Sequence, residues 1–210
     1  WKPKDSTETN FSKLPNAGSN VLEYEEGIYM GYKYYETMAD AIAKETATVE
    51  DNGPLYSADI KAYLAENADV DYTTADGWYD TNVVYPFGYG LSYTTFEWSD
   101  FEVTMDNTAT LTKDTNFTAS VTVKNTGDYA GKDVVEIFME APYIKNGIEK
   151  AKVSLVGFAK TKTLAKNESE TVTVKFDAYD IAAYDWNDLN GNNHTGYELD
   201  LGDYKFYASK

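Results

Sequence analysis

Acidic side chains are the most abundant groups in this sequence that could do chemistry. The 210 residues include 35 Asp and Glu, 18 basic residues that are all Lys, one His and no Cys. Carboxylates can act in pairs as general acid and base, but among so many acids a pair of neighbours says little. The lack of Cys excludes a disulfide framework, a thiolate nucleophile and a Cys-ligated zinc site. The lone His194 excludes a multi-His metal site and leaves Ser-His-Asp chemistry dependent on one residue.

One loop resembles a calcium-binding sequence. Residues 185–193 read Asp-Trp-Asn-Asp-Leu-Asn-Gly-Asn-Asn, which is rich in side-chain oxygens. Against the pattern of a calcium loop, however, Leu189 stands at a ligand position and no Glu closes the loop at its twelfth position. We therefore expect a polar hairpin between two strands, with His194 exposed to solvent. No metal and no organic cofactor are expected.

The charge of the chain excludes several classes of partner. A net charge of −17 at pH 7, without a single Arg, argues against binding to nucleic acid or to an anionic membrane. No apolar run approaches the ~18–20 residues of a membrane span. Because the chain begins at Trp1 and shows no signal-like stretch, we expect a fragment or a processed piece. The compartment stays unknown, with secreted or cell-envelope favoured over cytoplasmic.

The elements that must position these groups are mainly strands in the second half of the chain. From residue 99 onward, apolar and polar residues alternate with a period of two, as in strands with one buried face. The runs 133–139 and 153–159 are apolar on both faces and are expected to be central strands. About seven short strands in roughly 110 residues, separated by turn signals, predict a mainly β fold with an immunoglobulin-like β-sandwich.

The first 36 residues have a different pattern. Residues 1–22 are polar and contain two prolines, which predicts an irregular segment. Residues 23–36 are rich in Tyr and are interrupted by Gly27 and Gly31. This composition favours a strand or an extended segment with close backbone packing.

Two further segments precede the sandwich. Residues 37–82 are rich in Ala, Asp, Glu and Thr, and Thr37 resembles the N-cap of a helix, so we expect a partly helical insert. Residues 83–98 place Gly88 and Gly90 among aromatic side chains. The glycines allow backbone angles closed to other residues, and the aromatic side chains would anchor the segment, which predicts a rigid connector.

Several of these stretches resemble one enzyme family. Residues 26–35, Glu-Gly-Ile-Tyr-Met-Gly-Tyr-Lys-Tyr-Tyr, are similar to a segment E-G-I-Y-V-G-Y-R-Y-Y of glycoside hydrolase family 3. Residues 86–96, Pro-Phe-Gly-Tyr-Gly-Leu-Ser-Tyr-Thr-Thr-Phe, match the family pattern P-F-G-[HY]-G-L-S-Y-T-x-F almost completely. The segments 121–128, 131–135 and 155–160 resemble the fibronectin type III-like domain that closes many members. The chain thus looks like the C-terminal part of a β-glucosidase-like member of the family.

The resemblance implies a division into two domains. Residues 1–98 would be the C-terminal portion of the family's α/β sandwich domain, carrying the insert 37–82 and the connector 83–98. Residues 99–210 would form the fibronectin type III-like β-sandwich domain. The insert is far longer than in simpler members and comparable to that of bacterial members with permuted domains.

The resemblance also implies where the chemistry lies. The family's nucleophilic Asp belongs to a barrel domain, in an S-D-W-like context, and this chain has only Trp98-Ser99-Asp100. The general acid lies upstream of the segment matched by residues 26–35. We therefore expect no catalytic residue in this chain. The parent protein would hydrolyse terminal β-linked sugars with retention, most simply as a β-glucosidase. Its partners would be the barrel, the rest of the α/β domain and an oligosaccharide or β-glucoside substrate.

Four residues could have either a functional or a structural role. Glu25 and Glu26 could act near a catalytic site, but an acid before a Gly- and Tyr-rich segment more often accepts hydrogen bonds. Trp78 and Tyr79 could line the rim of a sugar-binding site, because aromatic rings pack against the C–H faces of a pyranose. Their alternative role is to pack the insert onto its host domain.

Two other functions are compatible with the sequence. A non-catalytic carbohydrate-binding or cell-surface display module would fold around residues 99–210 and bind polysaccharide through exposed aromatic side chains. A processed chain that reassembles with a separate catalytic chain would expose apolar surface on residues 1–98 when isolated.

Overall fold

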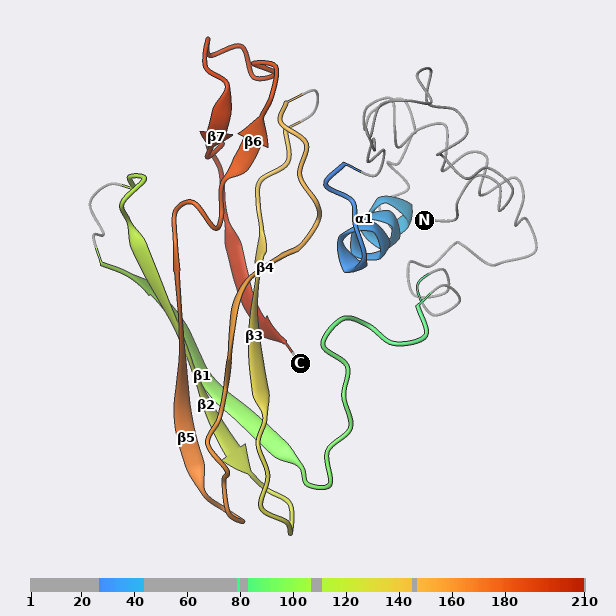
Figure 1. The fold of residues 1–210 in the computed structure, drawn as a ribbon, viewed down its shortest axis with the longest axis vertical. Coiled ribbons are helices and arrows are strands. Elements are labelled where there is room, and N and C mark those ends of the chain that lie inside the picture. The colour runs from blue at the N-terminus through green and yellow to red at the C-terminus, as the bar shows by residue number, and fades with distance from the viewer. Residues whose placement is uncertain (1–26, 44–78, 80–82, 107–110, 145–146, 210) are drawn as a thin grey trace, which may run out of the picture.

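The computed structural model describes residues 27–43, 79, 83–106, 111–144 and 147–209, and its chain is mostly strands (Figure 1). The elements are α1 (Tyr32–Ala43), β1 (Phe96–Met105), β2 (Asn116–Asn125), β3 (Val134–Glu140), β4 (Ser154–Lys160), β5 (Ser169–Asp177), β6 (Ala183–Asp185), β7 (Gly196–Glu198) and β8 (Lys205–Ser209). The mainly β fold expected from the alternating pattern is confirmed.

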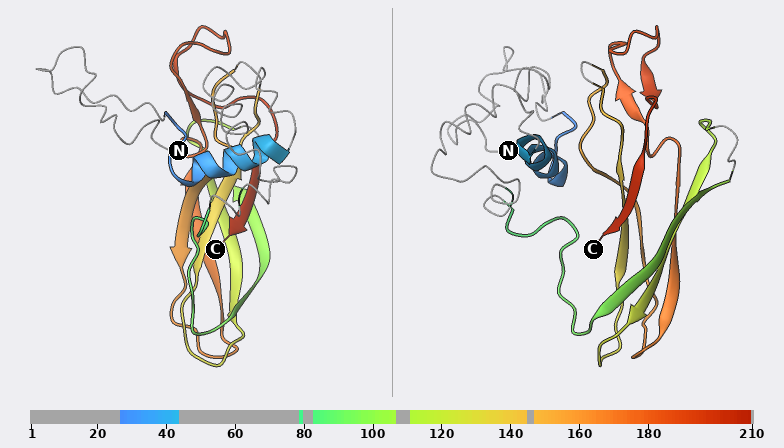
Figure 2. Two further views of the ribbon diagram at one scale, coloured as in Figure 1. Left: turned by 90° about the vertical axis from the view of Figure 1, so that its right-hand side faces the viewer. Right: turned by 180° about the vertical axis from the view of Figure 1, so that it is seen from behind.

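Two antiparallel sheets pack face to face. One has the strand order β1-β2-β5 and the other the order β4-β3-β8. A small sheet of β6 and β7 extends beyond one end of the sandwich (Figures 1 and 2). Because β2 and β3 are each paired on both sides, they supply the centres of the two sheets.

The core lies between the two sheets and is built from the alternating apolar positions. Phe117 of β2 stacks on Phe176 of β5 with ring centroids 5.1 Å apart, and Phe206 of β8 closes the same end. The other side chains of β2, β3 and β5 in this core are Ala119, Val121, Val123, Val135, Ile137, Met139, Val172 and Val174. Their removal from water supplies the main driving force for the sandwich.

Strand β4 differs from its prediction. It was expected at the centre of a sheet because residues 153–159 are apolar on both faces, but it forms the edge of the β4-β3-β8 sheet. Val156 packs against the core, whereas Phe158 is 67% exposed. The backbone N–H of Leu155 is bonded to a side chain of α1. Helix α1 therefore covers the strand near Leu155, and the apolar side chain of Phe158 is left exposed.

Helix α1 also corrects the sequence interpretation. The segment 23–36 was predicted to be extended, with a helix beginning at Thr37, yet the helix begins at Tyr32. Gly31 adopts a left-handed φ of 57° immediately before it. Thr37 lies inside the helix, where its hydroxyl donates to the carbonyl of Lys33 at 2.5 Å. The Tyr-rich composition favours a strand only weakly, and packing against the sheet overrides that preference.

The connector is only partly anchored. Gly88 has a φ of 84°, as its glycine allows, whereas Gly90 does not adopt a left-handed φ, so that expectation was wrong. Phe87 packs against the sandwich, but Tyr93 is 98% and Leu91 91% exposed. The prediction of aromatic anchoring therefore holds for Phe87 and fails for Tyr93.

Some predictions fall outside the described residues. These include the irregular segment 1–22, most of the insert 37–82, and the side chains of Glu25, Glu26 and Trp78. In the part of the chain that is described, no helix has the length and apolar character needed to cross a membrane.

Candidate functional site

The strongest candidate for a functional surface is the contact between α1 and the β4-β3-β8 sheet. The helix runs across the outer face of this sheet, on the side away from β1, β2 and β5 (Figures 1 and 2). The Tyr32 hydroxyl accepts a hydrogen bond of 2.8 Å from the backbone N–H of Leu155. Its ring meets Phe138 edge-on, with centroids 5.9 Å apart, and lies 4.6 Å from the ring of Phe87. Aromatic contacts thus join the helix, the connector and the sheet.

The electrostatics around Tyr32 follow from this burial. Burial raises the pKa of its phenol, the Leu155 N–H opposes that shift, and the carboxylate of Glu136 adds to it. The phenol therefore stays neutral over the physiological range and acts as a hydrogen-bonding group rather than as an acid.

A polar network joins the same helix to the sheet. Lys152 forms ion pairs with Asp40 of α1 at 3.0 Å and with Glu140 of β3 at 2.8 Å. Its backbone N–H donates to the hydroxyl of Thr37 at 2.9 Å. Burial alone would lower the pKa of Lys152, but its bonds to Glu140 and Asp40 outweigh that effect and raise it. Lys152 thereby joins a helix and a strand that are far apart in the sequence.

Glu140 is held as a carboxylate by the same network. Burial would raise its pKa, but the hydrogen bond and charge of Lys152, with a smaller contribution from Lys205, hold the pKa below its usual value. The Lys205 ammonium lies 3.5 Å away. Lys152 and Glu140 are therefore both charged at neutral pH, and their ion pair has a structural role.

Glu136 is in an unusual environment. Its Oε2 is buried and accepts no hydrogen bond among the residues that the structure describes. Burial raises the pKa of the carboxyl group. A Cβ added to Gly88 would lie 2.3 Å from this oxygen, so a larger residue in the connector would displace the Glu136 carboxylate.

Tyr79 lies beside α1. Its hydroxyl donates to Glu36 Oε1 at 2.5 Å. Burial and then the interaction with Glu36 raise the pKa of Tyr79 well above its ordinary value. The contact joins the end of the insert to Glu36, just before the insert begins, as the packing role considered for this residue would require. Its neighbour Trp78 lies outside the described residues.

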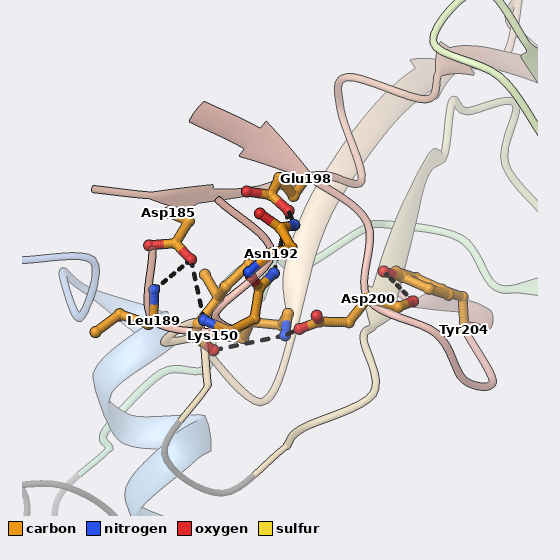
Figure 3. A network of polar contacts seen from close by, with 9 residues as sticks. Lys150, Asp185, Leu189, Asn192, Glu198, Asp200 and Tyr204 are labelled. Carbon is orange, nitrogen blue, oxygen red and sulfur yellow. Dashed lines mark hydrogen bonds and ion pairs between the residues drawn. The ribbon is translucent and has the colours of Figure 1, made fainter. Parts of the chain in front are cut away.

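The loop with the calcium-like sequence is a hairpin that joins β6 to β7, as its sequence predicted. Asp185 is fully buried, and its carboxylate accepts backbone N–H groups of Asn187 at 3.0 Å, Leu189 at 2.8 Å and Asn190 at 3.4 Å (Figure 3). Burial would raise the pKa of Asp185, but these backbone donors outweigh it and lower the pKa. The Asp185 oxygens thus organise the loop, and His194 beyond it is exposed.

A buried ion pair lies at the base of this hairpin. The ammonium of Lys150 is bonded to the carboxylate of Asp200, and both side chains are over nine-tenths buried (Figure 3). The Tyr204 hydroxyl donates to the carbonyl of Asp200 at 3.2 Å. Higher in the loop, the amide of Asn192 donates to Glu198. Within the described ranges, no group of three or more His, Cys, Asp or Glu is arranged to hold a metal ion.

Sequence reasoning missed the residues that join α1 to the sheet. Lys152, Glu136 and Glu140 carried no motif, because each is an ordinary charged residue in an acidic chain. The alternation in β3 could have signalled two of them, since Glu136 and Glu140 fall on the face opposite the core residues Val135, Ile137 and Met139.

Known proteins resemble the sandwich and most of the rest of this chain. The family model of the fibronectin type III-like domain matches residues 133–210. A β-glucosidase from Ruminococcus albus is 38% identical over 81% of this chain, and β-glucosidase A from Butyrivibrio fibrisolvens is 34% identical over 90% of it. The chain spans only 17% and 19% of the lengths of these two relatives.

Solved structures agree. A β-glucosidase from Paenibacillus barengoltzii is 29% identical to this chain, with a TM-score of 0.61. The match covers 95% of this chain and 17% of the chain of that enzyme. β-Glucosidase 3B from Thermotoga neapolitana, solved in complex with glucose, is 28% identical to this chain, with a TM-score of 0.56. The match covers 88% of this chain and 18% of the chain of that enzyme.

This chain therefore contains a fibronectin type III-like domain and is similar to a portion, less than a fifth of the length, of known β-glucosidases. The resemblance seen in the sequence, to the C-terminal part of a β-glucosidase-like enzyme of glycoside hydrolase family 3, is confirmed.

Proposed function

We propose that the parent of this chain is a retaining β-glucosidase acting on terminal β-linked sugars, and that this chain braces its catalytic domains. The observation that carries the proposal is the contact between α1 and the β4-β3-β8 sheet. There Tyr32 and Leu155, which are 123 residues apart, share a hydrogen bond within an aromatic and ionic interface. An interface of this kind holds a segment of one domain against another domain.

The catalytic steps belong to carboxyl groups outside this chain. Retention of configuration requires an acid and a nucleophile about 5–5.5 Å apart on either side of the scissile bond. Within the described residues, the most buried carboxylates have structural partners instead. Asp200 is paired with Lys150, and Asp185 accepts backbone N–H groups. We therefore propose that the chain alone is inactive.

The proposal includes the domain division at residues 98 and 99. The family match at 133–210 supports a sandwich domain in the second half of the chain. It also includes the barrel and the remaining α/β domain as partners and a β-glucoside as substrate, which the glucose complex of the Thermotoga neapolitana relative supports. A bacterial source is proposed from the length of the insert 37–82.

A contact of Trp78 and Tyr79 with substrate remains a further part of the proposal. The hydroxyl of Tyr79 is already bonded to Glu36, so a sugar would meet its ring rather than its hydroxyl. Trp78→Ala in the full-length protein is expected to raise KM for a cello-oligosaccharide and to leave kcat nearly unchanged. An unchanged KM would assign the pair to packing alone.

The test is hydrolysis of an aryl β-glucoside by the full-length protein and by the 210-residue chain. We expect turnover by the full-length protein only, with the β-anomer of glucose as the first product by NMR. Turnover by the isolated chain would contradict the division of roles. An inert full-length protein that still binds polysaccharide would favour the non-catalytic carbohydrate-binding alternative.

A further inference from the structure

A cluster of exposed tyrosines lies on the hairpin of β6 and β7. Tyr184 and Tyr197 are directly opposite each other across the two strands, so their side chains share one face. Their ring centroids are 5.0 Å apart, and the ring of Tyr179, from the turn before β6, lies 4.2 Å from that of Tyr197. These tyrosines are 50% to 57% exposed, and Trp186, two residues after Tyr184, is 69% exposed.

The backbone beneath these rings is held in place before any ligand arrives. Asp185, on the opposite face from Tyr184, fixes the loop through its backbone hydrogen bonds, and the buried pair of Lys150 and Asp200 lies at the base of the hairpin (Figure 3). The interaction with Tyr197 raises the pKa of the Tyr179 phenol. A surface that is already ordered loses less entropy on binding than a mobile one.

The composition of this surface indicates the chemistry of its ligand. Exposed phenols combine apolar faces with hydroxyls that donate and accept hydrogen bonds, which suits a polyhydroxylated ring. Exposed polar residues lie close to these tyrosines in the sequence, among them Asp180, Asn187 and Thr195. The net charge of −17 disfavours an anionic ligand.

The angles between the rings restrict the form of the ligand. The planes of Tyr179 and Tyr197 are inclined by 42°, and those of Tyr184 and Tyr197 by 68°. Rings at such angles cannot all lie flat on one crystalline face, but they can follow a single flexible chain. We propose that Tyr179, Tyr184 and Tyr197 form a binding surface for a soluble, neutral β-glucan, outside the catalytic site of the parent enzyme. Only the β-linkage rests on the proposed function.

The test is affinity electrophoresis of the 210-residue chain in native gels that contain barley β-glucan. The glucan should retard the chain. The double variant Tyr184→Ala/Tyr197→Ala should bind at least about tenfold more weakly, because it loses the binding free energy of two aromatic rings that the glucan would cover. The matched control is Tyr129→Ala. This tyrosine is 68% exposed in the turn between β2 and β3, at the other end of the sandwich (Figure 1).

A second variant separates binding from folding. Tyr184→Phe/Tyr197→Phe keeps the rings and the packing, so it should retain most of the retardation. The proposal is overturned if the unmodified chain migrates as in a gel without glucan, or if Tyr129→Ala weakens binding as much as the double alanine variant. It is also overturned if sedimentation shows that these tyrosines join two copies of the chain.

The failure of this inference and that of the proposed function can be told apart. In the full-length protein, the double alanine variant should hydrolyse an aryl β-glucoside at the unmodified rate while losing glucan binding. If the full-length protein binds glucan but hydrolyses no aryl β-glucoside, the binding surface is supported and the proposed β-glucosidase function is refuted. Retardation by the neutral α-glucan pullulan equal to that by barley β-glucan would contradict the β-linkage assigned here.

Discussion

Replacing Gly88 by Ala should weaken the attachment of the connector to the sandwich. The φ of 84° at this position is left-handed, and an L-residue there costs roughly 1–2 kcal/mol. The new Cβ would also lie 2.3 Å from Glu136 Oε2 and 3.0 Å from its Cδ, so the carboxylate must move. Because these atoms are the end of a flexible side chain, moving them costs less than overpacking a rigid core, about 1 kcal/mol. We expect Gly88→Ala to lower the free energy of unfolding by about 2–3 kcal/mol.

The two causes can be separated with a second substitution. Glu136→Ala removes the atoms that the new Cβ would meet but leaves the backbone conformation unchanged. In that background, Gly88→Ala should cost only the roughly 1–2 kcal/mol of the left-handed φ. The difference between the two backgrounds is the coupling between Gly88 and Glu136.

The assay is urea unfolding of the 210-residue chain followed by circular dichroism, with thermal unfolding in parallel. A loss of 1 kcal/mol in a chain of this size corresponds to a fall in Tm of about 2–4 °C. Gly90→Ala is the matched control, since Gly90 is two residues away, has no left-handed φ and has open space around a Cβ. Equal effects of Gly88→Ala and Gly90→Ala would refute the reasoning.

Three further substitutions test the polar groups. Lys152→Ala should cost about 1–2 kcal/mol at neutral pH. That cost should shrink in acid, because Glu140 has a lowered pKa and its contribution is lost as pH falls through that value; urea unfolding at a series of pH values measures it. Glu136→Gln should raise Tm at neutral pH but have little effect below about pH 4.3. The reason is that a carboxyl group whose pKa is raised by folding makes the protein less stable as the pH rises. An equal change in Tm at both pH values would contradict this. Asp185→Ala should speed amide hydrogen exchange in the β6–β7 loop while leaving β2 protected, and uniform protection would contradict its role there.

The sandwich was predictable because its signal is repeated many times. The alternation of Phe117, Ala119, Val121 and Val123 in β2 can be satisfied only by a strand with one buried face. The edge position of β4 was not predictable, because an apolar residue facing a helix and one facing a second sheet look the same in the sequence.

The candidate interface was beyond sequence reasoning for a different reason. Tyr32, Lys152 and Glu140 come together only because α1 crosses the sheet, and nothing local indicates a partner so far along the chain. The Tyr-rich segment also concealed the helix itself, since its residue types favour strands and its burial depends on tertiary contacts. The family motifs marked this region as important without indicating which atoms meet.

The most direct test of the bracing role is the Lys152→Ala variant of the full-length protein. Its thermal inactivation and its kinetics on an aryl β-glucoside should be measured side by side. If this chain supports the catalytic domains without taking part in catalysis, the variant inactivates at a lower temperature while kcat and KM at low temperature are unchanged. A changed KM with unaltered thermal inactivation would place the interface at the substrate and contradict the account.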